Sequence, residues 1–237
     1  MLIYGDCFEK LHTISDGSVD MIFTDPPYDG MTHNRWDKVI DLDRMWKEFS
    51  RIIKDNGAIA IWAQSPFNHR LAMSNEKLYR YEWVIEKTQP GGFLNAKRMP
   101  MRSHEDILIF CKRLPLYQPQ MTHGHERKVA KERPGNFAQG NYGEYGTNTY
   151  DSTDRYPRDV LTFSWDKQKS ALHPTQKPIK ACEYFINTYT KPGDIVLDPF
   201  MGSGSICLAA KNLGREFIGI ESDKEIFERA RDRLETA

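Results

Sequence analysis

The chain has 237 residues, 39% of them hydrophobic, and its 33 basic residues balance 33 acidic ones, so net charge alone does not indicate a nucleic-acid partner. The four cysteines lie far apart without a Cys-x-x-Cys spacing, which argues against a zinc site or disulfide framework and favours the reducing cytoplasm. No apolar run approaches the roughly 20 residues of a membrane helix, and the first acid, Asp6, comes too early for a signal peptide.

The first strong element is the apolar stretch at 19–24 within "VDMIFTDPPYDG", which we expect to be a buried strand. Pro26 and Pro27 cannot extend this strand, because each lacks an amide N–H and has a fixed φ. Asp25 is therefore expected at the carboxyl end of the strand, with Tyr28 just beyond the stiff turn. Taken alone, the pattern also fits a strand that merely stops at a proline turn.

Strand-like and helix-like segments then alternate. The expected elements are a helix at 41–53, a strand at 58–63, a helix from 65, and strands at 81–87 and 106–112. Asn56 and Gly57 are expected to end the first helix, and Ser65 to cap the second with Pro66 at its first position. This order predicts an α/β fold with a mostly parallel, doubly wound sheet covered by helices.

The alternation breaks at 113–165, a stretch rich in Gly, Tyr, Asn and charge with no sustained period. Such a long irregular stretch is unusual inside a compact domain and indicates a functional or disordered insert. The alternation resumes afterwards. We expect a helix at 179–190, a strand at 193–200, a helix at 205–214, a strand at 216–221 and a last helix at 223–235.

The loop "DPFMGSGS" is expected between one of these strands and the helix after it. Gly202 and Gly204 allow a sharp turn and the close approach of a ligand. Glu221 follows Gly204 by 17 residues, where an acid can accept hydrogen bonds from both ribose hydroxyls. The loop has no lysine and lacks the third glycine of a nicotinamide-binding loop, so adenosine without a pyrophosphate fits best. An ordinary tight turn is an equally good interpretation of this loop by itself.

In open α/β sheets, ligands bind beyond the carboxyl ends of the strands, at the switch point of the strand order. Both "TDPPY" and "DPFMGSG" occupy such ends, so they can be neighbours although the chain separates them widely. One loop would then hold an adenosine cofactor, and the other would present a reacting group beside it.

In these motifs the chain resembles the β-class DNA amino-methyltransferases, which use S-adenosylmethionine. It has "DPPY", a variable region, "HPTQKP" and "DPFMGSGS" in the order of that family. The resemblance implies a Rossmann-like methyltransferase domain at 1–112 and 166–237, with a target-recognition region inserted at 113–165. It also implies double-stranded DNA as the partner, and it allows a cognate restriction endonuclease and a homodimer.

The resemblance implies a role for each matching residue. Asp25, Pro26, Pro27 and Tyr28 match the catalytic motif. The acid of "GDCFE" would contact the cofactor's adenine, and two residues of "HPTQKP" its carboxylate. The expected cofactor-binding residues are Asp6, Cys7, Asp25, Thr175, Lys177, Asp198, Phe200, Gly202, Ser203, Gly204, Glu221 and Ser222. For Lys177, a plain surface lysine at a helix start is the alternative.

The chemistry required by such an enzyme agrees with the motif. The exocyclic amine of adenine is a poor nucleophile, and the Asp25 carboxylate with the Pro26 carbonyl could accept its two N–H groups. The ring of Tyr28 would stack on a base that has left the duplex. His123 and His125 have too few companions for a metal site, so we expect no metal. Residues 97–133 hold nine basic and four acidic residues, which suits phosphate contacts, although a solvated charged loop would look the same.

Several functions remain open at this point. Asp before Pro-Pro-Tyr favours adenine N6 as the target, whereas cytosine N4 is the nearest alternative. An enzyme that methylates RNA or a protein glutamine is more distant, because the glutamine enzymes resemble "NPPY". A non-catalytic DNA-binding relative would be expected to lack Asp25 or the glycine loop, and the chain has both.

Overall fold

A central sheet of eight strands organises the computed structural model of the chain, which describes residues 1–28, 39–130, 150–164 and 176–236. The order of the strands is β1-β10-β9-β2-β3-β5-β4-β8. Neighbouring strands are parallel, except that β5 is antiparallel to β3 and β4. The strands are β1 (Leu2–Tyr4), β2 (Val19–Thr24), β3 (Ile53–Ala63), β4 (Tyr79–Gly91), β5 (Arg102–Phe110), β8 (Val160–Phe163), β9 (Ile195–Asp198) and β10 (Glu216–Glu221).

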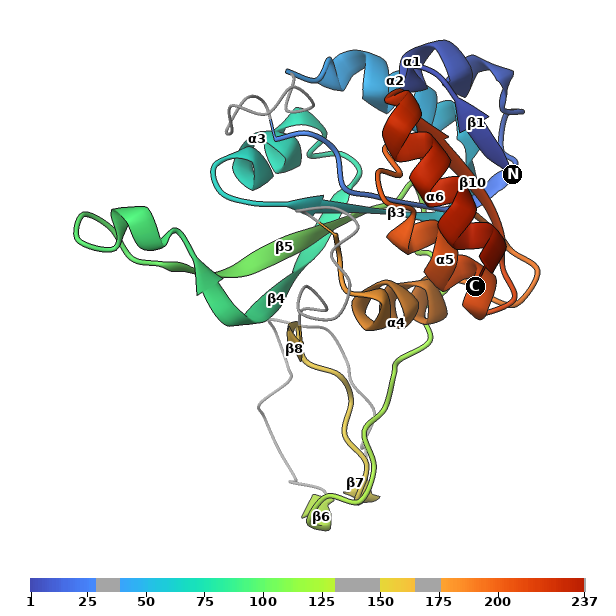
Figure 1. Cartoon of the computed structure of the whole chain (residues 1–237). Helices are drawn as coiled ribbons and strands as arrows, with labels where there is room; N and C mark the ends of the chain where they lie inside the picture. Colours follow the sequence, from blue (N-terminus) through green and yellow to red (C-terminus); the bar gives the residue numbers. More distant parts are fainter. Residues whose placement is uncertain (29–38, 131–149, 165–175, 237) are drawn as a thin grey trace. The chain divides into compact units, whose positions relative to one another are not determined.

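Helices cover both faces of this sheet, as Figure 1 shows for α2 and α3 on one side of β3 and α4 on the other. The helices are α1 (Cys7–Lys10), α2 (Leu42–Ile52), α3 (Phe67–Ser74), α4 (Ile179–Tyr189), α5 (Ser205–Asn212) and α6 (Lys224–Thr236), with short 3-10 turns η1 (Leu11–Thr13) and η2 (Phe93–Asn95). Within the described ranges, none of these helices is long and apolar enough to cross a membrane. The expected doubly wound α/β architecture is confirmed.

The alternation of side chains along the strands divides the core between the two faces. Phe49 of α2 and Phe67 of α3 pack on one face with Ile22 and Ile61, whereas Phe23 and Trp62 point to the other face. Phe185 of α4 joins that second cluster, and all of these side chains are fully buried. Strands buried on both faces read as continuous apolar runs, which is why the sequence pattern identified them.

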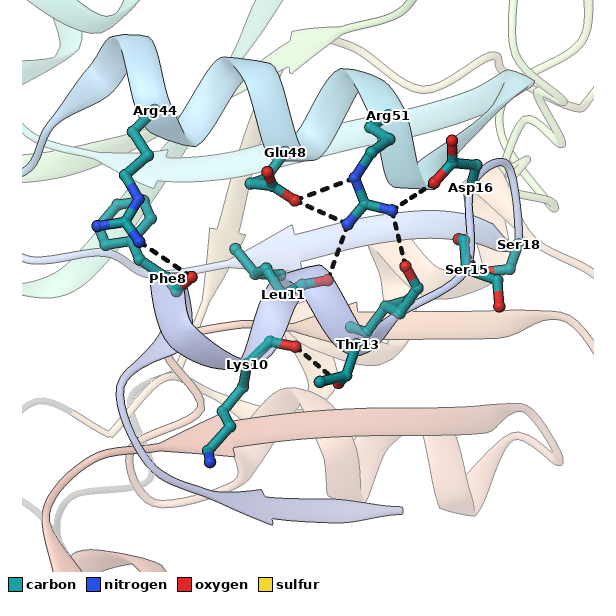
Figure 2. A network of polar contacts seen from close by, with 11 residues as sticks. Phe8, Lys10, Leu11, Thr13, Ser15, Asp16, Ser18, Arg44, Glu48 and Arg51 are labelled. Carbon is teal, nitrogen blue, oxygen red and sulfur yellow. Dashed lines mark hydrogen bonds and ion pairs between the residues drawn. The ribbon is translucent and has the colours of Figure 1, made fainter.

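The segment after α1 is fastened to α2 by one arginine. Arg51 donates to the carbonyl oxygens of Leu11 and Ile14 at 2.9 and 2.8 Å, and it also bonds the carboxylates of Glu48 and Asp16 (Figure 2). A planar guanidinium can donate to several acceptors at once, so Arg51 satisfies backbone carbonyls of this segment and holds it against α2. The clamp helps to fix α1, whose N-cap residue Asp6 lies at the sheet edge described below.

Two expected helix boundaries are wrong. The helix of residues 41–53 ends at Ile52, and Asn56 and Gly57 lie in β3. A Cβ on Gly57 would come 2.7 Å from the Asp20 carbonyl oxygen, so the glycine serves the close approach of β3 to β2. The expected cap at Ser65 is also wrong, because α3 begins at Phe67 with Pro66 at its N-cap and no side-chain cap.

The chain divides into two compact units, one formed by 1–118 and 159–237 and the other by 119–158. The second unit contains a two-stranded ladder of β6 (Lys128–Ala130) and β7 (Tyr150–Ser152). In that unit His123 Nδ1 lies 2.9 Å from Asp154 Oδ1, and His125 Nε2 lies 2.7 Å from Thr122 Oγ1. The insert expected at 113–165 includes 131–149, which lie outside the described residues, and its role in target recognition stays a prediction.

Candidate active site and cofactor loop

The two motifs meet at the carboxyl edge of the sheet, because β2 and β9 are parallel neighbours in the register Met21↔Val196 and Ile22↔Leu197. Just past this pairing, Thr24 Oγ1 donates to Asp198 Oδ1 at 2.7 Å, and both residues are buried. From β2 the chain continues to β3 on one side, and from β9 to β10 on the other. This is the switch point of the sheet, where α/β proteins bind their ligands.

The turn after β2 presents Asp25 with its two carboxylate oxygens in different surroundings. Oδ1 accepts from the Tyr28 hydroxyl at 2.6 Å and lies 3.2 Å from Lys177 Nζ. Oδ2 has no partner among the described residues, and the side chain is 22% exposed. Burial raises the pKa of Asp25, while the positive charge of Lys177 opposes this rise. Tyr28 and Lys177 therefore hold one oxygen, and the described residues leave the other without a partner.

Tyr28 is fixed on both its ring and its hydroxyl. Its ring stacks on Phe67 with centroids 5.5 Å apart and an interplanar angle of 26°. Its hydroxyl donates to Asp25 and accepts from Lys177 Nζ at 3.2 Å. Burial and the nearby carboxylate of Asp25 raise the pKa of Tyr28 well above its usual value, so the phenol stays neutral and remains a donor. The sequence predicts a role for the ring, and the structure adds partners for the hydroxyl.

Lys177 lies inside this site rather than on the surface. Its ammonium is 2.7 Å from Glu105 Oε2, 4.7 Å from the centre of the Trp62 ring, and within 3.2 Å of both Asp25 and Tyr28. Burial opposes its charge, but the two carboxylates outweigh that effect and raise the pKa of Lys177. An ammonium has three hydrogens, and here three protein oxygens surround it.

The loop after β9 is held in a different way. Gly202 and Gly204 have φ values of +48° and +74°, a region that side chains disfavour. Glu221, at the end of β10, receives the Gly202 amide at 3.1 Å and the Asp223 amide at 2.8 Å. A Cβ on Gly202 would meet nothing within 4 Å, whereas one on Gly204 would touch Ala230 at 3.4 Å. The lack of a side chain at Gly204 thus allows α6 to pack closely, and the lack of one at Gly202 leaves open space in front of the loop.

The residues after β1 complete this edge, because β1 pairs with β10 in the register Tyr4↔Glu221. Asp6 caps α1 by accepting from the Phe8 amide at 2.9 Å. The ring of Phe8 meets Phe200 of the glycine loop edge-on, with centroids 6.5 Å apart. Three segments from both ends of the chain therefore converge around Glu221.

Comparison with known proteins identifies the family. The family model described as DNA methylase, for N6 and N4 enzymes, matches residues 19–232. The chain belongs to this family. The Type II methyltransferase M2.LlaDCHI of Lactococcus lactis subsp. cremoris is 32% identical over 263 residues, covering 99% of this chain and 88% of that protein. DNA adenine methyltransferase YhdJ of Escherichia coli is 29% identical, covering 100% of this chain and 83% of YhdJ.

Solved structures agree with this assignment. The crystal structure of the M1.HpyAVI–SAM complex matches this DNA methylase family member with a TM-score of 0.66 and 28% identity, over 98% of each chain. The cytosine-N4-specific PvuII DNA methyltransferase matches with a TM-score of 0.70 at 18% identity, over 98% of this chain and 85% of that one, which supports the fold. The family resemblance drawn from the motifs is thereby confirmed.

The structure distributes the expected site residues of this family member over two neighbouring groups. Asp25, Pro26, Pro27, Tyr28 and Lys177 surround the turn after β2. Thr175 lies outside the described residues. The other expected residues lie at the ends of β9 and β10 or in the segments after β1, β9 and β10, and they are Asp6, Cys7, Asp198, Phe200, Gly202, Ser203, Gly204, Glu221 and Ser222. Their contacts with a cofactor stay predictions.

Two of these residues have unusual acid–base surroundings. Burial raises the pKa of Asp198 to about 7, although Thr24 and the Phe200 amide both donate to its carboxylate. Burial also raises the pKa of the Cys7 thiol to about 12, so this cysteine is not an activated nucleophile.

The sequence predictions missed Glu105, Lys87 and Phe67 as parts of the site. Burial opposes the ionisation of Glu105, but the charges of Lys177 and Lys87 outweigh it and lower its pKa to about 2. One signal was visible in "HEDILIF", since two adjacent acids at the start of a buried strand need partners. Which lysines supply that partnership depends on strand register, which the sequence does not display.

Proposed function

We propose that this protein is a site-specific DNA methyltransferase that transfers a methyl group from S-adenosylmethionine to the exocyclic N6 amine of adenine in double-stranded DNA. The observation that supports this most is the asymmetric environment of the Asp25 carboxylate. Tyr28 and Lys177 bind its Oδ1, whereas Oδ2 has no partner among the described residues, and the glycine loop follows the neighbouring strand β9. The relatives named as Type II methyltransferases, and YhdJ as a DNA adenine methyltransferase, agree with it.

The residues after β1, β9 and β10 fit an adenosine-containing cofactor. The open space before Gly202 admits a ligand close to the backbone, and no phosphate-binding lysine is present in the loop. Glu221 would accept hydrogen bonds from the ribose hydroxyls, and Asp6 would contact the adenine. When bound, S-adenosylmethionine supplies a sulfonium methyl group whose departure leaves a neutral thioether. Thr175 remains a predicted contact of its carboxylate, whereas Lys177, whose three hydrogens reach Glu105, Asp25 and Tyr28, would have to release one of these oxygens to make the contact predicted for it.

At the catalytic turn, Asp25 Oδ2 accepts one N–H of the target amine and the Pro26 carbonyl accepts the other. These two acceptors favour a pyramidal nitrogen, which returns the lone pair from the ring to the nitrogen and aims it at the methyl carbon. As the N–C bond forms, the nitrogen becomes positively charged. It then loses one proton along the hydrogen bond to Asp25, and water carries this proton away.

The base must leave the duplex to reach this turn. Tyr28 offers an aromatic face for it, supported from behind by Phe67 at 5.5 Å. Stacking of a base on an aromatic side chain contributes about 1–3 kcal/mol, enough to offset much of the unpairing. The Phe67 contact keeps the Tyr28 ring in place before a base arrives, so its entropy of ordering is already lost.

The DNA contacts are proposed to involve the turn between β4 and β5, which Figure 1 shows extending away from the helical layers. From residue 88 to 104 the chain has Lys97, Arg98 and Arg102 and no acid. All three are exposed, as are Phe93 at 78% and Leu94 at 95%. Cations beside exposed apolar side chains suit a nucleic acid, whose phosphates and bases need both kinds of contact.

Two further expectations belong to this proposal. A cognate restriction endonuclease and a homodimer are compatible with the relatives' designation as Type II methyltransferases. The cytoplasm is the proposed location, since all four cysteines are free and buried. Cytosine N4 is the second candidate target, because its exocyclic amine presents the same two N–H groups to Asp25 and Pro26.

The test is the identity of the methylated base in plasmid DNA from cells that express the protein. Digestion to nucleosides followed by mass spectrometry should show N6-methyladenine, and cells with Asp25→Ala protein should lack it. N4-methylcytosine would support the second candidate instead. Plasmid DNA with neither base, from cells that contain folded protein, would contradict the proposal.

A further inference from the structure

Four charged side chains form a continuous chain of contacts behind the catalytic turn. Lys87 Nζ lies 2.6 Å from Glu105 Oε1, Glu105 Oε2 lies 2.7 Å from Lys177 Nζ, and Lys177 Nζ lies 3.2 Å from Asp25 Oδ1. The side chains of Lys87, Glu105 and Lys177 are only 13%, 10% and 7% exposed. The charges alternate in sign, so two cations balance two anions.

Stability alone gives little reason for such an arrangement. Removing charges from water is unfavourable, and replacing a buried ion network by apolar side chains often leaves stability unchanged or higher. The neighbouring residues Trp62, Ile85 and Ile107 are apolar and buried, so an apolar filling would suit this face of the sheet. This series of charged side chains ends on Asp25 of the catalytic turn, which indicates a role in that turn.

The contacts explain how this series of charged side chains constrains Asp25. Lys177 reaches Glu105, Asp25 and Tyr28 with its three hydrogens, so its ammonium is fixed in position. Lys177 and Tyr28 both engage Oδ1 of Asp25, and this fixes the rotation of the carboxylate. Glu105 anchors Lys177 from behind, and Lys87 neutralises Glu105 so that its charge does not act on Asp25 unopposed.

We propose that Lys87 and Glu105 are positioning residues, which hold the Lys177 ammonium on Oδ1 of Asp25 so that Oδ2 is presented, ionised, to the target amine. Neither residue would touch the substrate. The inference rests on the proposed function for the identity of that amine, whereas the arrangement of charges around Asp25 does not depend on it.

The electrostatics of the site agree with this role. Burial and the charge of Glu105 raise the pKa of Asp25, and Lys177 lowers it. Without Lys87, Glu105 would act on Asp25 and Lys177 with its full charge. Among the described residues, the other titrating groups that act on Asp25, or on which Asp25 acts, are Tyr28 on the same turn, Asp198 on β9 and Cys182 on α4. None of these is altered in the variants below.

The decisive variant is Lys87→Met, which keeps the length of the side chain and removes its charge. We expect the pKa of Asp25 to rise by about 1, read by ¹³C NMR of aspartate carboxyl carbons with Asp25→Asn to assign the signal. The rate of methyl transfer should fall roughly tenfold, and the acid limb of its pH profile should move to higher pH. Cofactor affinity should stay within about twofold, because Lys87 is not near the glycine loop.

The double variant Lys87→Met/Glu105→Gln tests the effect of charge on the pKa of Asp25 separately from the effect of the position of Lys177. Removing Glu105 as well should return the pKa of Asp25 to the parent value or below, since the unopposed anion is gone. The transfer rate should remain low, because Lys177 has lost its anchor. Lys54→Met is the matched control: Lys54 bonds Asp20 at 2.6 Å at the opposite end of β2, and its loss should leave Asp25 unchanged.

Three results would overturn the proposal. They are an Asp25 titration that Lys87→Met does not move, a double variant whose shift exceeds that of the single variant, and a double variant with full transfer rate. The NMR titration needs no methyl transfer, so it tests the charge chain even if the protein proved to methylate no DNA. Failure of the proposed function and failure of this inference are thus seen in separate measurements.

Discussion

The turn after β2 and the loop after β9 lie side by side at one sheet edge, but different forces hold them in place. Buried charges hold the first, since Asp25, Tyr28 and Lys177 contact one another and Glu105. Backbone amides and glycine conformations hold the second, through Gly202, Gly204 and Glu221. The catalytic turn should therefore respond to changes of charge, and the cofactor loop to changes of shape.

The largest effect is expected at the catalytic turn. Asp25→Ala removes the proposed acceptor of the amine N–H, and methyl transfer should fall by about 10³-fold or more. Cofactor affinity should fall by much less than the transfer rate, because most of the expected cofactor contacts lie outside the turn. Single-turnover kinetics and calorimetry measure the two quantities. Residual turnover within about tenfold of the parent would mean that Asp25 only shapes the turn.

A substitution that changes the shape of the loop should affect the loop and not the turn. Gly202→Val places a branched side chain in the open space before the loop, and S-adenosylmethionine should bind roughly 100-fold more weakly. Gly17→Val is the matched control, because Gly17 has a φ of +57° and also has nothing within 4 Å of its Cβ. Both variants should lose about 1–2 kcal/mol of stability, but only Gly202→Val should lose cofactor affinity. Equal affinities in calorimetry would contradict the assignment of the loop.

The stability of the protein should depend on pH through Asp198, which bonds Thr24 of the neighbouring strand and whose pKa burial raises to about 7. The unfolded carboxyl titrates near 3.9, so the folded protein binds the extra proton and loses stability as pH rises from about 4 to about 7. Asp198→Asn has no such proton to lose. The unfolding free energy of Asp198→Asn minus that of the parent should therefore increase by about 1–3 kcal/mol from pH 5 to pH 8.5.

Urea denaturation at the two pH values measures this gain. Asp43→Asn, at an exposed position of α2, provides the control, and its stability should follow the parent's at both pH values. A pH-independent difference between Asp198→Asn and the parent would show that Asp198 is already ionised at pH 5.

Substitutions of Tyr28 test whether the turn uses both its ring and its hydroxyl. Tyr28→Ala should slow transfer by roughly 5- to 150-fold, the equivalent of about 1–3 kcal/mol of stacking. Tyr28→Phe keeps the ring but loses the bond to Asp25, and about fivefold is expected from one hydrogen bond. Fluorescence of 2-aminopurine at the target position follows base unstacking, and it should stay high with Phe and drop with Ala. Equal losses in both variants would count against stacking.

The smallest effect is expected on the exposed turn between β4 and β5. Replacing Lys97 and Arg98 by Ala should weaken DNA binding at low salt and reduce its salt slope by about 0.9 for each phosphate that the variant no longer neutralises. Lys47→Ala, at an exposed position of α2, should leave the slope unchanged. A slope that neither change alters would remove this turn from the DNA surface.

Local patterns predicted most of the sheet and most of the helices correctly. The apolar run at 19–24 forms β2 within the same bounds, and Gly214, with a φ of +68°, follows α5 as expected. At one of the two failed helix boundaries, a non-local contact decided the outcome. Gly57 looked like a helix stop, but it serves the approach to the Asp20 carbonyl on a neighbouring strand.

The two loops could be predicted from local sequence, because a stiff Pro-Pro turn and glycines that allow positive φ depend on adjacent residues. The sequence did not determine the partners of Asp25. Lys177 and Glu105 are 72 residues apart, and they meet only because β5 is antiparallel to β3 and α4 starts behind that face. Ion pairs in a protein interior depend on distance and burial, which arise from strand register and helix packing. The cofactor loop could therefore be predicted from the sequence, whereas the series of charged side chains behind Asp25 appeared only in the folded structure.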